Sequence, residues 1–248
     1  MGIYSTDMKY ILVLLAIILG SIGIDLIRVY AKYQVTKNLI RESRSFSFRP
    51  ENPAEKILVA GDSTAVGTGV SDPIQSIAGR FHHDFPNAEI VNVAHNGFTV
   101  REIIDEVTST QGPFDLVVLQ AGANDIIFFA SLDKATKDMK TLLEEAKKRS
   151  SHVVLLTSGN IGIAPIFWPP LSWVYSWRTM KLHQAFRTVA KAEGIPFVEL
   201  YKLRADDPFA KDENKYYAAD GTHLTGDGYA YWYLQIRNVL GDRVSSFR

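Results

Sequence analysis

The chain has no cysteine, so disulfides, thiol nucleophiles and cysteine-ligated metal sites are all excluded. It also has no excess of charge of either sign, because 27 Lys and Arg residues balance 27 Asp and Glu residues. A chain without net charge has no overall field to attract nucleic acid, and we expect no nucleic-acid partner. The lack of cysteine leaves the compartment open, since disulfide-free proteins occur on both sides of membranes.

One stretch of the sequence is long and apolar. Residues Tyr10 to Ile24 carry no charge, and as a helix they would span about 22 Å, against about 30 Å for the hydrocarbon core of a bilayer. Only Lys9 is basic before this run, and no Ala-x-Ala cleavage pattern follows it closely. We therefore predict an uncleaved membrane anchor over residues 1–31. A cleaved signal sequence and a helix of a soluble protein stay as alternatives.

The segment that follows the apolar run is basic. It contains the single acid Glu42 and the basic residues Arg28, Lys32, Lys37, Arg41, Arg44 and Arg49. The positive-inside rule assigns such a flank to the cytoplasm, so we expect the anchored domain on the cytoplasmic face, with the periplasmic or extracellular side as the alternative. Residues 32–54 are polar and end with Pro50 and Pro53, and we predict a basic tether there, ahead of a catalytic domain over residues 55–248.

From residue 55 onward, short apolar segments alternate with helical patterns. The apolar segments are 57–60, 90–94, 116–120, 153–157 and 197–200, and the helical patterns cover about 73–84, 99–110, 131–149, 172–193 and 226–240. Strict alternation predicts a parallel sheet covered by helices. We expect a three-layer α/β/α domain with a flavodoxin-like, five-stranded parallel sheet, preceded by an N-terminal hydrophobic helix.

Polar motifs follow the first three predicted strands. Ser63 ends Gly-Asp-Ser, Gly97 ends His-Asn-Gly, and Asn124 lies in Gly-Ala-Asn-Asp. Near the end of the chain, Asp-Gly-Thr-His places Asp220 three residues before His223. Each motif alone could be a helix cap or a turn. In a parallel sheet, however, the carboxyl ends of the strands meet where ligands bind, so a nucleophile, a base and amide donors could share one site.

In combination, these motifs resemble the blocks of the SGNH hydrolases, also called GDSL esterases and lipases, over residues from about 56 to 240. The resemblance implies that Ser63 attacks an ester carbonyl, that His223 is the base and that Asp220 orients it. It also implies an oxyanion hole made by the backbone N–H groups of Ser63 and Gly97 and the amide of Asn124, and a reaction through an acyl-enzyme without cofactor or metal.

The resemblance leaves the substrate open. A small-molecule ester or a lipid fits it, and a lipid, a lysolipid, a short acyl ester or a thioester stay as alternatives. A non-catalytic domain of the same fold that binds an acylated or glycan ligand, and an acyltransferase that uses the same residues, are the two other classes. The complete set of nucleophile, base, acid and Asn124 favours catalysis, because a binding domain does not need all four.

Two other kinds of enzyme are excluded by the residues beside the motifs. The larger α/β-hydrolases have Gly-x-Ser-x-Gly at the nucleophile, whereas Ala65 occupies the last position here. A phosphate-binding loop needs Lys-Ser or Lys-Thr after its glycines, and neither follows Gly67 and Gly69.

The remaining histidines do not form a metal-ligand pattern. His82 and His83 are adjacent, and His152 and His183 stand alone, so we expect packed or solvated side chains. His95 lies close enough to Gly97 to line the cleft. We assign Asp62 and Asp125 to structure, as acceptors for loop backbone.

An aromatic stretch, residues 165–177, contains three of the four tryptophans, Trp168, Trp173 and Trp177. Trp173 and Trp177 are four residues apart and could pack a helix on the sheet. Alternatively, the stretch could line an acyl-chain site or lie on the bilayer beside the anchor.

Overall fold

The computed structural model describes residues 3–241, so residues 1–2 and 242–248 of the predicted domain division lie outside the described part. Five strands form one parallel sheet in the order β2-β1-β3-β4-β5. The strands are β1 (Glu55–Gly61), β2 (Ala88–Asn92), β3 (Leu116–Gln120), β4 (Val153–Leu156) and β5 (Phe197–Val198). This confirms the predicted flavodoxin-like sheet, although only two residues of the last apolar segment pair as a strand.

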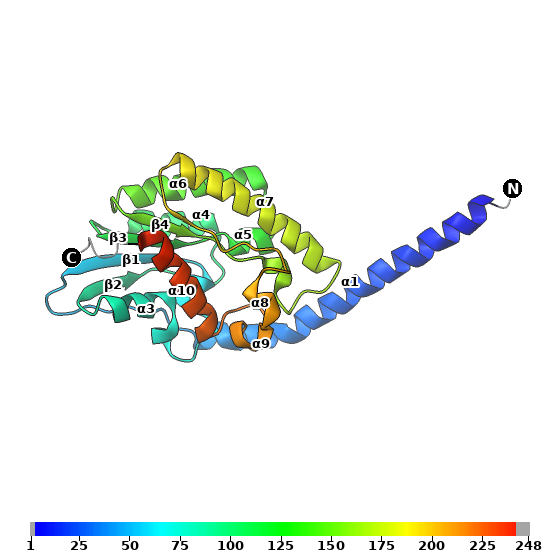
Figure 1. Cartoon of the computed structure of the whole chain (residues 1–248), viewed down its shortest axis with the longest axis horizontal. Coiled ribbons are helices and arrows are strands. Elements are labelled where there is room, and N and C mark those ends of the chain that lie inside the picture. Colours follow the sequence, from blue (N-terminus) through cyan, green and yellow to red (C-terminus); the bar gives the residue numbers. More distant parts are fainter. Residues whose placement is uncertain (1–2, 242–248) are drawn as a thin grey trace.

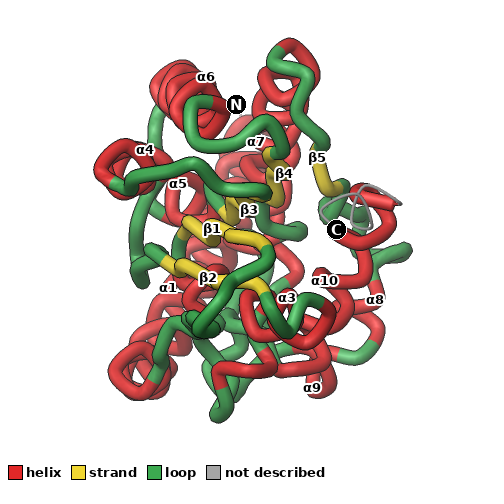
Figure 2. The backbone as a smooth tube through the Cα atoms, turned by 90° about the vertical axis from the view of Figure 1, so that its left-hand side faces the viewer, coloured by secondary structure: helices red, strands yellow, loops and turns green. Residues whose placement is uncertain are grey.

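Helices cover both faces of the sheet (Figure 2). One layer contains α4 (Val100–Ser109), α6 (Leu132–Lys147) and α7 (Leu171–Ala192), and the other contains α3 (Ile77–Asp84) and α10 (Gly226–Leu240). Successive strand residues point to opposite faces. Leu58 therefore packs in the core under α4, α6 and α7, and Val59 in the core under α3 and α10. The domain has the three predicted layers.

Short helices complete the loops at the carboxyl end of the sheet. They are α2 (Ser63–Val66), α5 (Ala123–Ile127), α8 (Pro208–Lys211) and α9 (Glu213–Tyr216), with two 3-10 turns, Pro73–Gln75 and Ile161–Ile163. The helical periodicity of the sequence does not reveal them, because four or five residues are too few to show an apolar face.

The N-terminal helix α1 (Ile3–Glu42) is 40 residues long, and its first half projects away from the domain (Figure 1). It contains a window of mean hydropathy 2.5 that is long and apolar enough to cross a membrane. α1 continues unbroken past residue 31, the predicted end of the anchor, to Glu42. Beyond the helix, Phe48 pairs with Ile90 through backbone bonds of 3.0 and 2.7 Å. The chain is therefore bound to the sheet at Phe48, within the expected tether.

Candidate active site

Ser63 is placed by a sharp turn at the end of β1. A Cβ on Gly61 would lie 2.2 Å from the carbonyl oxygen of Gln120, so only glycine fits where β1 passes β3. Asp62 then caps α2, because its Oδ1 accepts the Thr64 N–H at 2.9 Å and the Thr64 hydroxyl at 2.8 Å. Ser63 is the first residue of this helix and is partly exposed. Burial raises the pKa of Asp62 to about 6, although both Thr64 bonds favour its ionised form.

Asp220 and His223 form a closed pair within one turn. Asp220 Oδ2 lies 2.6 Å from His223 Nδ1, and Asp220 Oδ1 accepts the backbone N–H groups of Thr222 and His223 at 2.9 and 3.0 Å. Burial alone would raise the pKa of Asp220. The hydrogen bond and charge of His223, together with the two backbone donors, instead lower this pKa to about 2. The carboxylate is therefore ionised and can hold the imidazole with its Nε2 turned away from Asp220.

The two further candidate donors come from the loops after β2 and β3. Gly97 has φ +84°, and a Cβ there would meet open space. The Asn124 amide donates one N–H to the Phe98 carbonyl at 2.9 Å, which leaves its second N–H available. Asp125 accepts the Val100 N–H at 2.9 Å, so it bonds the backbone at the start of α4.

These residues converge on one cavity of about 430 Å³. Its lining includes Ser63, Gly97, Asn124 and His223, with Asp220 fully buried behind the imidazole. Among the described residues no hydrogen bond joins the Ser63 hydroxyl to His223. Nucleophile–base bonds are often long without substrate and tighten when it binds. The structure thus brings the candidate nucleophile, base, acid and amide donors to one place.

Most of the remaining wall is apolar and comes from distant parts of the chain. The apolar lining includes Val29, Tyr33 and Ile40 of α1, Ile127 and Phe128 at the end of α5, and Ile161, Ile163, Ala164, Ile166, Phe167, Leu200, Phe209 and Trp232. A cavity of this size and polarity suits a small organic ligand with an extended apolar part.

The other histidines lie elsewhere. His95 is not among the lining residues; its ring stacks on Phe98 and its Nε2 lies 3.6 Å from Glu106 Oε1. The Nε2 of the buried His183 lies 2.8 Å from Glu199 Oε2. Within residues 3–241, no cluster of three metal-ligating side chains occurs.

The two tryptophans of the aromatic stretch that lie four residues apart do not pack a helix on the sheet. Trp173 and Trp177 are 68% and 56% exposed, and neither lines the cavity. Of that stretch, Ile166 and Phe167 line the cavity. Trp173 and Trp177 instead face outward on α7.

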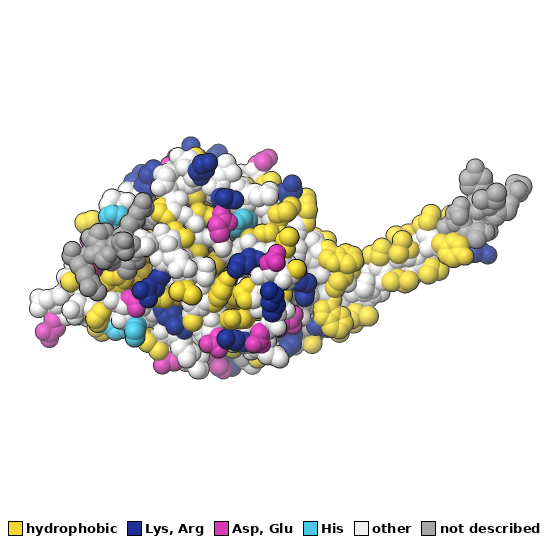
Figure 3. Space-filling view, in the orientation of Figure 1, with side chains coloured by type: hydrophobic (Ala, Val, Ile, Leu, Met, Phe, Trp, Pro, Cys, Tyr) yellow, Lys and Arg dark blue, Asp and Glu magenta, His cyan; other side chains and the backbone are white. Residues whose placement is uncertain are grey.

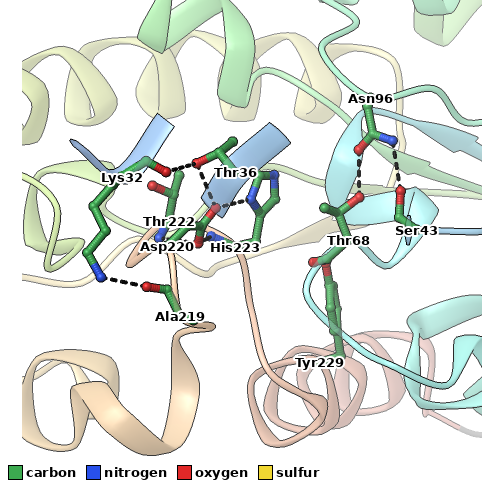
Figure 4. Close-up of polar contacts among 10 residues, drawn as sticks. All are labelled: Lys32, Thr36, Ser43, Thr68, Asn96, Ala219, Asp220, Thr222, His223 and Tyr229. Carbon is green, nitrogen blue, oxygen red and sulfur yellow. Dashed lines mark hydrogen bonds and ion pairs between the residues drawn. The ribbon is translucent and has the colours of Figure 1, made fainter. Parts of the chain in front are cut away.

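Two residues that contact this site were not predicted from the sequence. The Thr36 hydroxyl of α1 lies 3.1 Å from Asp220 Oδ2 (Figure 4). The Arg178 guanidinium of α7 donates to the carbonyls of Asp125 and Ile126, both at 2.9 Å, and so holds the short helix that carries Asn124. Both contacts cross long sequence separations, where no local pattern signals them.

Comparisons with known proteins agree with this geometry. Residues 59–231 match the GDSL-like lipase/acylhydrolase family. No curated protein matches the chain by sequence. A lipase/acylhydrolase from Enterococcus faecalis has the same fold, with 20% identity, a TM-score of 0.58, and coverage of 76% of this chain and 96% of its own. A protein of the lipolytic G-D-S-L family from Veillonella parvula is 18% identical, with a TM-score of 0.57. The match covers 74% of this chain and 97% of that protein.

An acetyl xylan esterase from Geobacillus stearothermophilus, crystallised as a variant, is 19% identical, with a TM-score of 0.55. The match covers 77% of this chain and 96% of that protein. At such identities the structural likeness shows a shared fold alone. The sequence match extends over most of the chain and includes all four motifs, from the serine turn to the histidine loop. The chain therefore belongs to the GDSL-like lipase/acylhydrolase family, a family of ester hydrolases.

Proposed function

We propose that the protein is a membrane-anchored serine esterase that hydrolyses carboxylic esters through an acyl-enzyme. The observation that supports this most strongly is the Asp220–His223 bond of 2.6 Å beside a cavity that Ser63 and Asn124 also line. A buried carboxylate on Nδ1 leaves Nε2 as the nitrogen that can take a proton from the serine.

The reaction begins when Ser63 Oγ bonds to the ester carbonyl carbon and its proton moves to His223 Nε2. The tetrahedral intermediate collapses, the carbon–oxygen bond to the alcohol breaks, and the imidazole returns the proton to that alcohol. Water then adds to the acyl-enzyme in the same way, giving the carboxylic acid and free Ser63. The oxyanion is held by the backbone N–H groups of Ser63 and Gly97 and by the second N–H of the Asn124 amide. Donors at this position stabilise the charge that develops in the transition state.

The apolar cavity favours an ester with a fatty acyl chain, such as a lipid or lysolipid. An apolar chain that enters such a cavity is removed from water. This burial contributes about 25 cal/mol of favourable free energy per Å² of apolar surface. Because α1 supplies part of that wall, the cavity lies at the end of the helix that we assign as the anchor. A long-chain ester could therefore pass from bilayer to cavity beside this helix.

Apolar side chains cover the projecting part of α1 and the adjacent end of the domain (Figure 3). We define the aromatic collar as the exposed residues Phe128, Phe129, Trp168, Trp173 and Trp177. Trp168 lies against α1, with the Arg28 guanidinium 3.4 Å from its ring centroid. Tryptophan prefers the membrane–water interface, so the collar would contact the leaflet from which α1 emerges. The basic flank of the apolar run favours the cytoplasmic leaflet.

Hydrolysis of 4-nitrophenyl esters from acetate to palmitate by the full-length protein in detergent tests this proposal. We expect turnover that rises with chain length, and loss of about a millionfold in kcat for Ser63→Ala. Ser109→Ala, an exposed serine at the end of α4, is the matched control and should leave kcat unchanged. Turnover that survives in Ser63→Ala would reject Ser63 as the nucleophile, and an optimum at acetate would reject the fatty acyl substrate.

A further inference from the structure

The second half of α1 is fastened to the domain by a row of polar side chains. Both carboxylate oxygens of Asp25 accept the backbone N–H of Trp168, at 2.9 and 3.2 Å. Arg28 donates to the Pro165 carbonyl at 3.2 Å, and Lys32 donates to the Ala219 carbonyl at 2.6 Å. With Thr36, these residues are spaced by three or four positions, so they share one face of the helix. That face contacts the loop that carries Asp220.

Thr36 completes the hydrogen bonding of the buried carboxylate. An ionised carboxylate has about four acceptor positions. Asp220 uses two for the backbone N–H groups of Thr222 and His223 and one for His223 Nδ1. The Thr36 hydroxyl, 3.1 Å from Asp220 Oδ2, supplies the fourth donor (Figure 4). Because Asp220 is fully buried, water cannot readily replace that donor.

The end of α1 also contacts the second loop of the site. Ser43, directly after the helix, accepts a hydrogen bond from the Asn96 amide at 3.0 Å. Asn96 precedes Gly97, and its side-chain oxygen accepts the Thr68 hydroxyl at 2.5 Å (Figure 4). α1 and the residue directly after it therefore contact both the acid–base loop and the loop of the candidate oxyanion donor.

We propose that α1 is a working part of the active site as well as an anchor, with Thr36 as a positioning residue for Asp220 and His223. This rests on the proposed function, because it assigns Thr36 to the catalytic pair of that reaction. The family match begins at residue 59, so α1 lies outside the matched part of the chain. Val29, Tyr33 and Ile40 of the same helix line the ester cavity, and seating of α1 therefore shapes both the catalytic pair and the substrate wall.

Thr36→Val in the full-length protein removes the hydroxyl and keeps the side-chain shape. With one donor fewer, Asp220 Oδ2 presents more negative charge to the imidazole, so the protonated imidazole persists to higher pH. We expect kcat/KM to fall about tenfold, as for a hydrogen bond to a charged group. We expect the acid limb of its pH profile to move up by about half a pH unit. Thr36→Ser, which keeps the hydroxyl, should restore both.

Thr141→Val on α6 is the matched control. Within residues 3–241, the Thr141 hydroxyl bonds only the carbonyl four residues earlier, Lys137, at 3.3 Å. Thr36 Oγ1 lies 3.3 Å from the Lys32 carbonyl oxygen in the same way, so its one O–H is shared between that carbonyl and Asp220 Oδ2. The control therefore removes an equal helix contact without touching Asp220, and it should leave the rate and the acid limb unchanged.

Two readouts separate this proposal from the esterase assignment. A fluorophosphonate reports whether Ser63 is activated, because Ser63 Oγ bonds to phosphorus, fluoride leaves, and the serine proton passes through His223 to solvent. The low-field proton NMR signal of the His223 Nδ1–H reports the Asp220 bond without any turnover, and Thr36→Val should shift it. Cooperative thermal unfolding checks that each variant is folded. If Thr36→Val does not fold, Thr36→Ala takes its place in the same measurements.

Wild-type protein that is not labelled at Ser63 would contradict the esterase assignment. Wild type that is labelled, beside a folded Thr36→Val with the same labelling rate, acid limb and NMR signal, would overturn the role of Thr36. A loss of rate in Thr36→Val with an unmoved acid limb and signal would also overturn it, because that result indicates a packing defect alone.

Discussion

Asp220 Oδ2 and His223 Nδ1 lie 2.6 Å apart, and the two residues are only three positions apart in the chain. Their relative geometry is therefore set within one loop, where the backbone N–H groups of Thr222 and His223 fix the second carboxylate oxygen. Ser63 and Asn124 reach the cavity from β1 and from the loop after β3. The acid–base pair is thus a preformed unit, whereas its distance to the nucleophile depends on how the loops pack.

Asp220→Asn should preserve the loop and disable the base. The amide oxygen can still accept the two backbone N–H groups, but its NH₂ group faces His223 Nδ1 and favours the tautomer with the proton on Nε2. We expect kcat to fall about ten-thousandfold with little change in KM, as for an orienting carboxylate in other triads. Steady-state kinetics with a 4-nitrophenyl ester measures this. Asp227→Asn, an exposed residue in the first turn of α10, is the control, and a small effect of Asp220→Asn would remove Asp220 from the triad.

Gly97→Ala tests the candidate oxyanion loop against a matched glycine. Gly97 and Gly194 have φ of +84° and +70°, and at both a Cβ would meet open space. Alanine is strained at positive φ, so each substitution should destabilise the fold by about 1 kcal/mol. Gly97 also lines the cavity, where the methyl group and the displaced N–H should lower kcat about a hundredfold. Equal kcat values for the two variants, measured beside their unfolding free energies, would contradict the role of Gly97.

The sheet and the motif loops could be predicted from the sequence because their signals are local. Buried parallel strands such as 57–60 are continuous apolar runs, and each polar motif directly follows its strand or begins a turn. The contact between Thr36 and Asp220 joins residues 184 positions apart, and no composition rule indicates it. The contacts of the basic segment are equally non-local, because Arg28 and Lys32 donate to the carbonyls of Pro165 and Ala219.

Asp62→Asn should stabilise the protein above pH 6. The folded-state pKa of Asp62, about 6, exceeds its ordinary value of 3.8 because the side chain is buried. A raised carboxyl pKa means that stability is greatest below about pH 4 and is lost as pH rises through 6. Asparagine stays neutral and its oxygen can accept the same Thr64 bonds. We expect a gain of about 3 kcal/mol in unfolding free energy at pH 8 and little at pH 4.

Urea unfolding at several pH values measures that difference. Asp72→Asn is the matched control, because Asp72 is exposed and accepts the N–H two residues ahead in the same way, at 3.0 Å. Its effect should not depend on pH between 5 and 8. An Asp62→Asn variant whose stability relative to wild type is the same at pH 4 and pH 8 would contradict the raised pKa of Asp62.

The aromatic collar predicts a measurable contact with lipid. Brominated phospholipid chains quench tryptophan fluorescence only at short range, so vesicles that contain them should quench wild-type protein strongly. Trp173→Phe with Trp177→Phe removes the two most exposed tryptophans and should remove most of that quenching. Trp232→Phe, a buried residue, should change it little. Quenching that persists unchanged in the double variant would show that this face does not contact the bilayer.

The side of the membrane can be determined because the chain has no cysteine of its own. A single introduced thiol is then an unambiguous reporter for a maleimide that cannot cross membranes. Ser109→Cys reports the domain, since Ser109 is exposed on α4, and Ser5→Cys reports the segment before the apolar run. With the basic flank in the cytoplasm, intact cells should label Ser5→Cys, and Ser109→Cys only after permeabilisation. The reverse pattern would place the domain outside the cytoplasm, and labelling of both without permeabilisation would show that α1 does not span the membrane.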